Sequence, residues 1–254
     1  MDRVLDVMVE AARVGGAIAR ERFTRGFAVS IKGDGSPVTE ADREAEAAIA
    51  RVLGAAFPAH GWLGEETGGR GPDDRRFIVD PIDGTRNFVA GIPFWATLIA
   101  LEEAGVATAG VVFQPLTGDL HVARRGGGAF LNGRSIRVSA IDALSGGALL
   151  HGSLDVIRRA GIWEGFLRLV DATPYQRGFG DFLSFTTVAE GKGEVALTPS
   201  VKPWDLAALR LLIEEAGGAF SDFEGRPSIY SGTAFATNGV LHATALARFR
   251  GDHP

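Results

Sequence analysis

The stretch Phe77-Ile78-Val79-Asp80-Pro81-Ile82-Asp83-Gly84-Thr85 decides how the rest of this sequence is interpreted. Its first three residues are apolar and favour a short buried strand, and Asp80-Pro81 predicts that the strand ends there. Asp80 and Asp83, as two carboxylates near a strand end, repel each other unless a cation lies between them. Gly84-Thr85, at the start of a helix, offers backbone N–H groups to an anion. The stretch therefore predicts a cation site and a phosphate site side by side.

The composition is that of a soluble globular protein. The 254 residues are enough for one large or two moderate domains, and 46% hydrophobic with 22% charged residues is ordinary for this class. The absence of cysteine excludes disulfides, thiolate zinc sites and cysteine nucleophiles. A net charge of −5 argues against a nucleic-acid partner. No segment has the character of a signal peptide or a membrane span, so a cytoplasmic protein without a membrane partner is expected.

The first half of the chain is predicted to fold as two helices against a sheet. Apolar residues recur at helical spacing over residues 2–24, and a capping-box pattern of Thr39 and Asp42 starts a second helix that runs to about Ala56. β-rich runs follow, and Asn132-Gly133 is a hairpin signal. The predicted strands cover residues 27–31, 77–79, 94–101, 106–113, 119–123 and 129–131. Residues 1–143 are therefore expected to form an N-terminal α+β domain.

Near residues 140–146 the pattern changes to an alternation of strands and helices. Strands are predicted at residues 148–151, 175–177, 195–197, 218–221 and 235–237, and helices at 162–170, 181–189 and 206–216. Such alternation implies an α/β layer, so residues 144–254 are expected to form a C-terminal α/β domain.

Carboxylates elsewhere in the chain are candidates to join Asp80 and Asp83 at a cation site. Oxygen ligands without cysteine favour magnesium or manganese over zinc. Glu65-Glu66 ends a short apolar segment, and Asp205 lies where a helix is expected to begin. Each keeps a second interpretation: Glu65-Glu66 as a solvated loop pair, and Asp205 as the N-cap of its helix. The two interpretations of Asp205 are compatible, because a capping aspartate retains a second oxygen.

Four motifs, taken together and in this order, resemble the inositol monophosphatase family of metal-dependent phosphatases. They are Gly64-Glu65-Glu66, Asp80-Pro81-Ile82-Asp83-Gly84-Thr85, Trp204-Asp205 and Glu215-Ala216-Gly217-Gly218. The resemblance covers nearly the whole chain, and the second motif is the specific one. It implies a layered α-β-α-β-α sandwich, the fold type of inositol monophosphatase and fructose bisphosphatase. It also implies a homodimer that hydrolyses small phosphate monoesters.

The resemblance implies a set of metal ligands, carried over position by position. Glu65, Asp80 and the Ile82 carbonyl would hold a first Mg²⁺ ion. Asp80, Asp83 and Asp205 would hold a second, and a third would lean on Glu65 through water, with Mn²⁺ as a possible substitute. Two such ions can activate an attacking water and stabilise the leaving oxygen of a phosphate ester.

Other residues are expected to act on the water and the phosphate. By resemblance, Thr85 and Glu65 position the attacking water, and Asp42 accepts a hydrogen bond from Thr85; Asp42 also has an interpretation as a plain helix-start residue. The N–H groups of Gly84 and Thr85 are expected to bind the phosphate, because a glycine lets an oxyanion approach closely. Residues 32–37 resemble the mobile flap of the family.

The segment Arg177-Gly178-Phe179-Gly180-Asp181-Phe182 corresponds to the substrate pocket of the family. An aspartate at position 181 resembles the histidinol-phosphate phosphatase subgroup, and a carboxylate suits a substrate with an ammonium group. Arg177 is expected to bind substrate as well, and Phe182 to pack against its ring; a helix N-cap is the alternative role of Asp181. Thr198 departs from the family, in which a glutamate commonly stands seven residues before the second-half aspartate.

Hydrolysis of histidinol phosphate, a step of histidine biosynthesis, is therefore the expected function. The alternatives are an inositol-1-monophosphatase or a broad sugar-phosphate phosphatase. A non-catalytic binding role, as in family members that assist transcription complexes, is a hypothesis of another class. The intact set of ligand residues argues against that last hypothesis.

Overall fold

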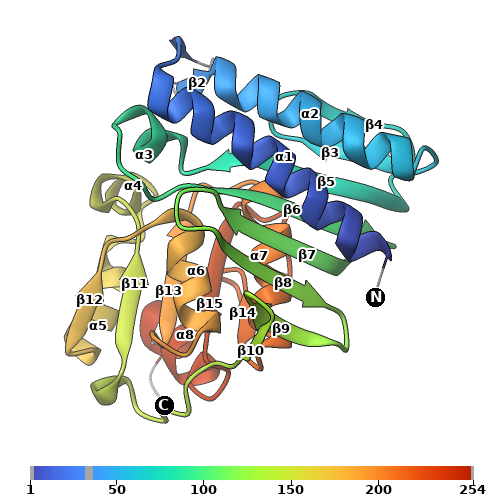
Figure 1. Cartoon of the computed structure of the whole chain (residues 1–254). Coiled ribbons are helices and arrows are strands. Elements are labelled where there is room, and N and C mark those ends of the chain that lie inside the picture. Colours follow the sequence, from blue (N-terminus) through green and yellow to red (C-terminus); the bar gives the residue numbers. More distant parts are fainter. Residues whose placement is uncertain (1–2, 32–36, 253–254) are drawn as a thin grey trace.

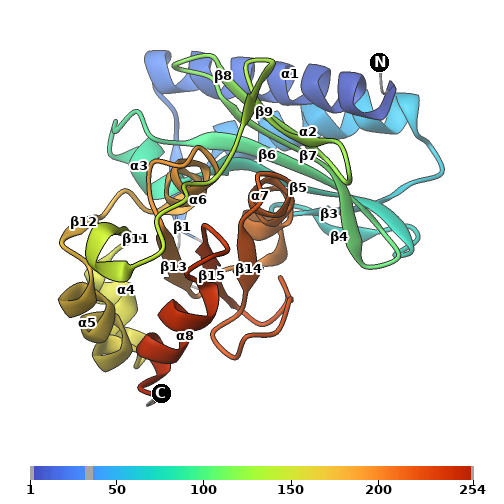
Figure 2. The same cartoon turned by 90° about the horizontal axis from the view of Figure 1, so that it is seen from below.

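Two β-sheets, each with helices on both faces, make up the chain (Figures 1 and 2). The computed structural model describes residues 3–31 and 37–252. The strands of the larger sheet are β3 (Gly61–Gly64), β4 (Gly68–Arg70), β5 (Arg75–Asp83), β6 (Ala96–Glu103), β7 (Val106–Gln114), β8 (Asp119–Arg124), β9 (Gly128–Leu131) and β10 (Arg134–Ile136). Their order is β10-β9-β8-β7-β6-β5-β3-β4, with one parallel pair, β3–β5. β1 (Val29–Ile31) and β2 (Pro37–Thr39) form a separate antiparallel pair.

The smaller sheet lies in the second half of the chain and has the order β12-β11-β13-β15-β14. Its strands are β11 (Ala148–His151), β12 (Tyr175–Arg177), β13 (Val195–Pro199), β14 (Ala219–Ser221) and β15 (Thr233–Thr237). β11 is parallel to β12 and β13, whereas β15 is antiparallel to both of its neighbours. The sheet is therefore mixed, and only part of it follows the parallel arrangement that strand–helix alternation suggests.

The helices form three layers around these sheets. They are α1 (Arg3–Arg25), α2 (Glu40–Ala56), α3 (Thr85–Val89), α4 (Leu154–Arg159), α5 (Trp163–Ala172), α6 (Asp181–Ala189), α7 (Pro203–Glu215), α8 (His242–Arg250) and a 3-10 turn, η1 (Leu144–Gly146). α1 and α2 cover the outer face of the larger sheet, α6 and α7 lie between the sheets, and α5 and α8 cover the far face of the smaller sheet (Figure 1). The expected α-β-α-β-α sandwich is confirmed.

The alternation of side chains along a strand divides each sheet between two cores. In β5, Phe77 and Val79 pack in the core of α1 and α2, whereas Ile78 packs in the central core of α6 and α7. In β13, Ala196 lies in that central core, whereas its neighbours Val195 and Leu197 lie in the core of α5 and α8. A strand buried on both faces needs a continuous apolar run, which is what Phe77-Ile78-Val79 provides.

Most elements lie where the sequence predicts them, and the elements that were missed are short. The helix over residues 181–189 matches α6, and α1 ends one residue beyond its predicted end. β2, β4, β10, α4 and α8 have no predicted counterpart, and each is nine residues or shorter, so each gave only a weak periodic signal. The flap expected at residues 32–37 lies outside the described residues except for Pro37. A division into two domains at residue 143 stays a prediction.

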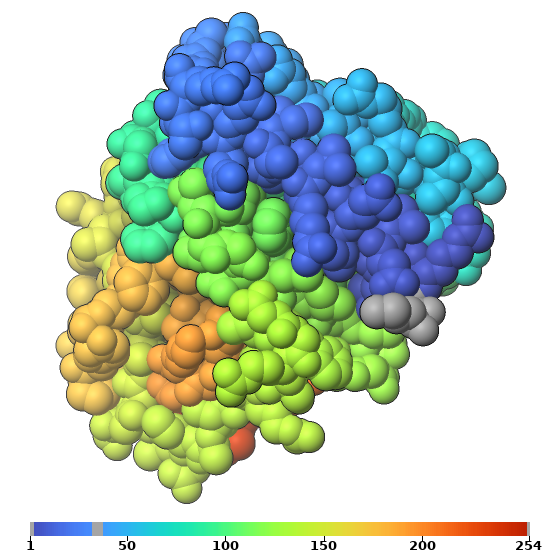
Figure 3. All heavy atoms as spheres, viewed as in Figure 1, coloured from blue at the N-terminus to red at the C-terminus, as the bar shows by residue number. Residues whose placement is uncertain are grey.

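The two halves of the chain lie directly against each other. In the space-filling view of Figure 3, blue and green residues of the first half adjoin yellow and orange residues of the second. The central core joins them, since it combines residues of β5, β6 and β7 with residues of α6, α7 and β15. Within residues 3–31 and 37–252, no helix has the length and apolar character needed to cross a membrane.

Candidate active site

A β-bulge near the end of β5 brings Asp80 and Asp83 to the same side of the strand. The two aspartates are three residues apart, but the β6 residues opposite them are only two apart. Residues three apart on a regular strand point to opposite faces, and the extra residue of a bulge cancels this offset. The buried Thr97 hydroxyl donates to the Pro81 carbonyl at 2.8 Å and so satisfies the backbone at the bulge. The paired carboxylates of the motif therefore depend on the irregularity between them.

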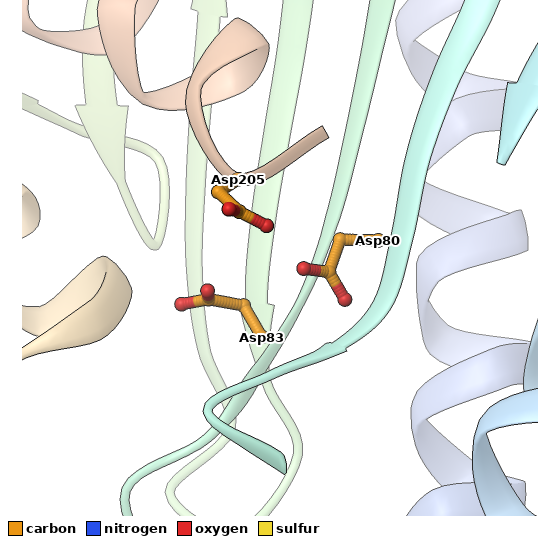
Figure 4. A group of neighbouring side chains, drawn as sticks. All are labelled: Asp80, Asp83 and Asp205. Carbon is orange, nitrogen blue, oxygen red and sulfur yellow. The ribbon is translucent and has the colours of Figure 1, made fainter. Parts of the chain in front are cut away.

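Asp205 reaches the same place from the first turn of α7. The helix begins at Pro203, so the prediction that Asp205 is its N-cap is wrong; Asp205 is its third residue. Its carboxylate accepts a hydrogen bond from the Lys202 backbone N–H at 2.8 Å. In Figure 4 the side chains of Asp80, Asp83 and Asp205 lie around a common space, and one oxygen of each lies within 4.8 Å of the others. Both halves of the chain thus contribute to one acidic cluster.

Burial raises the pKa of all three aspartates, and the charges of neighbouring carboxylates add to the rise. The pKa of Asp80 lies well above its usual range because of burial first, and then because of the charges of Glu65, Asp83 and Asp205. The pKa of Asp83 is raised well above that range by burial and by the nearby Asp181 and Asp205. Burial raises the pKa of Asp205 to about 6, against the effect of its backbone hydrogen bond. Three oxygen donors that repel one another at this distance fit a hard divalent cation such as Mg²⁺ or Mn²⁺.

Gly84 forms the tight turn between β5 and α3. Its backbone is left-handed, with φ of 90°, and a Cβ at this position would lie 2.9 Å from the Phe94 carbonyl oxygen and 3.2 Å from Asp181 Oδ2. Both the conformation and the space therefore require glycine. Thr85 follows as the first residue of α3, so the N–H groups of Gly84 and Thr85 stand beside the acidic cluster and both residues line its cavity.

Asp42 and Thr85 are close to each other, as expected. The Thr85 hydroxyl lies 3.0 Å from the Ile82 carbonyl oxygen and 3.4 Å from Asp42 Oδ1. Asp42 also forms the predicted capping box, because its other oxygen accepts from the Thr39 N–H at 2.7 Å and from the Thr39 hydroxyl at 2.6 Å. Burial raises the pKa of Asp42 to about 6, with hydrogen bonds from Thr39 opposing the shift. Both interpretations of Asp42 are thus compatible with its position.

Glu46, which belongs to none of the motifs in the sequence, holds the loop that carries Glu65. Its buried carboxylate accepts from the Glu66 N–H at 2.8 Å, from the Thr67 N–H at 3.0 Å and from the Thr67 hydroxyl at 2.6 Å. A Cβ on Gly64 would lie 2.4 Å from Glu46 Oε1, so the glycine makes room for this carboxylate. Glu46 follows Asp42 by four residues, which is about one helical turn. This spacing places both side chains on the same face of α2, so Glu46 could have been identified from the sequence.

We expect Glu46→Gln to lower the free energy of unfolding by about 1–3 kcal/mol, because an amide cannot accept from all three donors and leaves a buried polar group unsatisfied. For a chain of this size that corresponds to a fall in melting temperature of about 2–10 °C. Differential scanning calorimetry checks it. Glu44→Gln is the matched control on the same helix, where the exposed pair with Arg22 contributes roughly 0–1 kcal/mol. Equal effects of the two substitutions would contradict this role of Glu46.

A cavity of about 680 Å³ opens beside the acidic cluster. Its walls come from the first half through Glu65, the β5 turn and α3, and from the second half through α4, the start of α6 and the segment 198–201. Asp181 and Thr198 both line it, together with Arg86 and Arg159, which the sequence analysis did not identify. The cavity therefore has an acidic end at the three aspartates and a mixed wall of charged and apolar groups.

Asp181 has an unusual backbone and a specific partner. Its φ is 46°, in the left-handed region that aspartate tolerates better than most residues. Gly180, not Asp181, caps α6, so the alternative role as an N-cap is excluded. Asp181 Oδ2 accepts a hydrogen bond from Asn87 Nδ2 at 3.1 Å, and the next N–H of the chain, that of Phe182, donates to Asp83 Oδ2 at 2.6 Å. The start of α6 thus touches both the cavity wall and the acidic cluster.

Two residues of the predicted substrate segment do not lie in this cavity. The guanidinium of Arg177 lies 3.7 Å from the centroid of the Tyr175 ring and donates to the Gln176 carbonyl, away from the cavity lining. The Phe182 side chain is buried in the central core, so the expectation that it packs against a substrate ring is wrong. Phe179 lines the cavity instead and is 38% exposed.

Known proteins resemble this chain in sequence and in fold over nearly its whole length. The model of the inositol monophosphatase family matches residues 1–251. A histidinol-phosphatase from Mycobacterium tuberculosis is 44% identical over 226 residues, 87% of this chain and 87% of that protein. An inositol-1-monophosphatase from Mesorhizobium japonicum is 38% identical over 260 residues, 96% of this chain and 94% of that protein. The crystal structure of extragenic suppressor protein suhB from Bartonella henselae has a TM-score of 0.92 at 35% identity, over 98% of this chain and 99% of that one. The chain belongs to the inositol monophosphatase family.

Proposed function

We propose that this protein is a magnesium-dependent phosphatase whose physiological substrate is histidinol phosphate. Membership of the family makes the chain a phosphate monoester hydrolase. The observation that carries the choice of substrate is the Asp181 carboxylate, which lines the cavity beside the three-aspartate cluster. A negatively charged wall favours a substrate that bears an ammonium group near its phosphate ester. The similarity to a histidinol-phosphatase at 44% identity supports the same choice.

The proposed metal ligands are the ones that the resemblance implies. Glu65, Asp80 and the Ile82 carbonyl would hold one Mg²⁺ ion, and Asp80, Asp83 and Asp205 a second, with a third near Glu65. The raised pKa values and the short separation of the three aspartate oxygens support such a site. When bound, these ions supply positive charge that activates water and stabilises the leaving oxygen. The number of ions and the choice of Mg²⁺ over Mn²⁺ are part of the proposal.

The residues of the chain would bind the phosphate and orient the water. The backbone N–H groups of Gly84 and Thr85 would donate to phosphate oxygens in this scheme. In this scheme the Thr85 hydroxyl would donate to Asp42 Oδ1, 3.4 Å away, instead of to the Ile82 carbonyl at 3.0 Å, and its oxygen would accept a hydrogen bond from the attacking water. Glu65, at the edge of the cavity, holds that water from the other side.

Substrate recognition is assigned to the cavity wall that the second half of the chain contributes. Asp181 accepts the ammonium group, and the partly exposed Phe179 lies where it can pack against the imidazole ring. A contact of Arg177 with substrate stays a prediction that its position over Tyr175 does not support. The homodimer and the cytoplasmic location implied at the outset also stay predictions.

An inositol or sugar phosphate is the second candidate substrate. The 38% identity to an inositol-1-monophosphatase favours it. Thr198 lines the cavity where the family commonly has a glutamate, and the loss of that carboxylate weakens the substrate contact for either candidate. A turnover panel with Mg²⁺ separates the candidates: histidinol phosphate, inositol 1-phosphate, fructose 1,6-bisphosphate and glycerol 2-phosphate. A wide preference for inositol phosphate would overturn the proposal. Failure to hydrolyse any of the four would revive the hypothesis of a non-catalytic binding role.

We expect Asp181→Asn to lower the preference for histidinol phosphate over glycerol 2-phosphate by about 10–100-fold, measured as the ratio of the two kcat/KM values. Asparagine also tolerates a left-handed backbone, so this substitution removes the charge without straining the turn as alanine would. The ratio cancels losses that are common to both substrates. An unchanged ratio, at saturating Mg²⁺, would show that Asp181 does not recognise the ammonium group.

A further inference from the structure

The side chain of Asn87 connects the two walls of the cavity. Asn87 lies in α3, directly after the motif that carries the aspartates, and it lines the cavity. Its Nδ2 donates to the Phe94 carbonyl oxygen at 3.0 Å and to Asp181 Oδ2 at 3.1 Å. Both neighbours are acceptors only, which fixes the carboxamide orientation with the NH₂ group toward them. The two hydrogens of this group are therefore used by two partners, one from each half of the chain.

Two groups favour the charged Asp181 carboxylate at this position, the Asn87 amide through its hydrogen bond and the Arg86 guanidinium through its charge. Its carboxylate lies close enough to Asp83 and Asp205 for its charge to act on both of them, and like charges at this range repel. Its left-handed φ of 46° sets the direction of the Cα–Cβ bond, but the carboxylate can still rotate about its own torsions. The hydrogen bond from Asn87 opposes the repulsion and selects one of these rotations.

The hydrogen bond also leaves Asp181 able to bind a ligand. A carboxylate has two oxygens and about four lone-pair sites, and Asn87 uses one of them on Oδ2. The same Oδ2 would lie 3.2 Å from a Cβ on Gly84, so it faces the turn after β5. Oδ1 is then the oxygen that can turn toward a cation in the cavity. A fixed carboxylate binds an ammonium group with a smaller loss of side-chain entropy than a mobile one.

We propose that Asn87 is a positioning residue for substrate specificity, which holds the Asp181 carboxylate where it accepts the ammonium group of an amino-alcohol phosphate. This inference rests on the proposed function, because it assigns to Asn87 the preference for an amino-bearing substrate. It assigns to Asn87 no part in binding the metal or in the hydrolytic step. A phosphate ester without an ammonium group gains nothing from the arrangement, so the effect of Asn87 appears in the comparison of two substrates.

The test is a double-mutant cycle of Asn87→Ala and Asp181→Asn, read as the ratio of kcat/KM for histidinol phosphate to that for glycerol 2-phosphate at saturating Mg²⁺. In the wild-type background we expect Asn87→Ala to lower this ratio by about fivefold to tenfold, as for loss of a hydrogen bond to a charged group. In the Asp181→Asn background the same substitution is expected to change the ratio by less than about twofold, because the charge that Asn87 positions has gone.

Asn132→Ala is the matched control. Asn132, in the turn between β9 and β10, donates from Nδ2 to Asp119 Oδ1 of β8 at 3.0 Å. Neither residue lines the cavity, so the loss of this hydrogen bond should not move the ratio. Two results would overturn the role of Asn87 and leave the proposed function standing. One is an equal loss of kcat/KM for both substrates in Asn87→Ala, and the other is an equal change of the ratio in the wild-type and Asp181→Asn backgrounds. A wild-type protein that does not prefer histidinol phosphate overturns both.

Discussion

Asp83→Asn is expected to lower kcat/KM for any phosphate monoester by at least about a thousandfold, or roughly 4 kcal/mol of transition-state stabilisation, because it removes one anionic oxygen from the proposed metal site. The protein should remain folded. Asparagine retains a side-chain oxygen that can accept the Phe182 N–H, which is the one hydrogen bond that Asp83 Oδ2 is seen to make. Metal-free stability should even rise, since the substitution removes a buried charge from a cluster in which each pKa is raised.

Three measurements on one preparation check this expectation. Steady-state turnover with Mg²⁺ gives the loss of activity, thermal unfolding without metal gives the stability, and the rise in melting temperature on adding Mg²⁺ reports binding. Asp171→Asn, an exposed position of α5 outside the cavity lining, is the control and should leave all three unchanged. Turnover of Asp83→Asn within tenfold of wild type would exclude Asp83 as a metal ligand that the reaction needs.

The sequence predicts the chemistry of this site better than its geometry, and β5 shows why. The motif Asp80 to Thr85 is local, so its acidic pair, its glycine turn and the helix start after it can all be inferred from neighbouring residues. The bulge that brings Asp80 and Asp83 to one side depends on how β5 pairs with β6, and no signal within the motif contains that register. Carboxylates three apart would otherwise diverge.

The predictions that proved wrong, for Asp205, Asp181 and Phe182, all concern residues at the start of a helix. An error of one residue in the position of a helix start changes the direction of a side chain by about 100°. Pro203 at the first position of α7 was a usable signal that the helix begins before Asp205. Phe182 and Phe179 differ in the same way: the former lies within α6 and turns into the core, whereas the latter lies before the helix and faces the cavity. An aromatic run around a helix start does not tell which ring is buried.

Contacts between the two halves were beyond prediction for a different reason. Asn87 and Asp181 are 94 residues apart, and their hydrogen bond exists only because α3 and the start of α6 meet at the cavity. Asp205 joins the aspartates of β5 by the same packing of α7 against the larger sheet. Family resemblance supplied Asp205, since its motif is short but recognisable. No motif pointed to Asn87, and the only signal for Glu46 was its spacing of one helical turn from Asp42.

Mg²⁺ is expected to stabilise the protein far more at pH 8 than at pH 6. A carboxyl group whose pKa is raised by folding contributes stability that is complete below its unfolded pKa of about 4 and is lost as the pH rises through the folded value. For Asp205 that folded value is about 6, and for Asp80 and Asp83 the pKa is raised well above the usual range. The metal-free site therefore becomes more unfavourable across this window, and a cation that requires the ionised ligands binds better.

At pH 8, with Mg²⁺ at about a hundred times its dissociation constant, linkage gives about 2.7 kcal/mol, or a rise of roughly 5–10 °C in melting temperature. At pH 6 roughly half of that rise or less should remain, because protons compete for the same oxygens. The quantity to compare is the difference between melting temperatures with and without Mg²⁺ at matched ionic strength. The difference is used because two histidines also change the stability with pH. Burial lowers the pKa values of His60 and His242, so their effect on stability opposes that of the aspartates as the pH rises. They titrate in both samples, so their contribution cancels.

Asp83→Asn separates the site from nonspecific effects of the cation, since its Mg²⁺-induced rise should be small at both pH values. A rise of equal size at pH 6 and pH 8 in the wild type would mean that the cation does not displace protons from Asp80, Asp83 and Asp205. The three-aspartate cluster would then be an acidic patch rather than the place where the metal binds. A rise that grows with pH in the wild type, and is lost in Asp83→Asn, ties cation binding to the ionisation of the carboxylates that the bulge in β5 brings together.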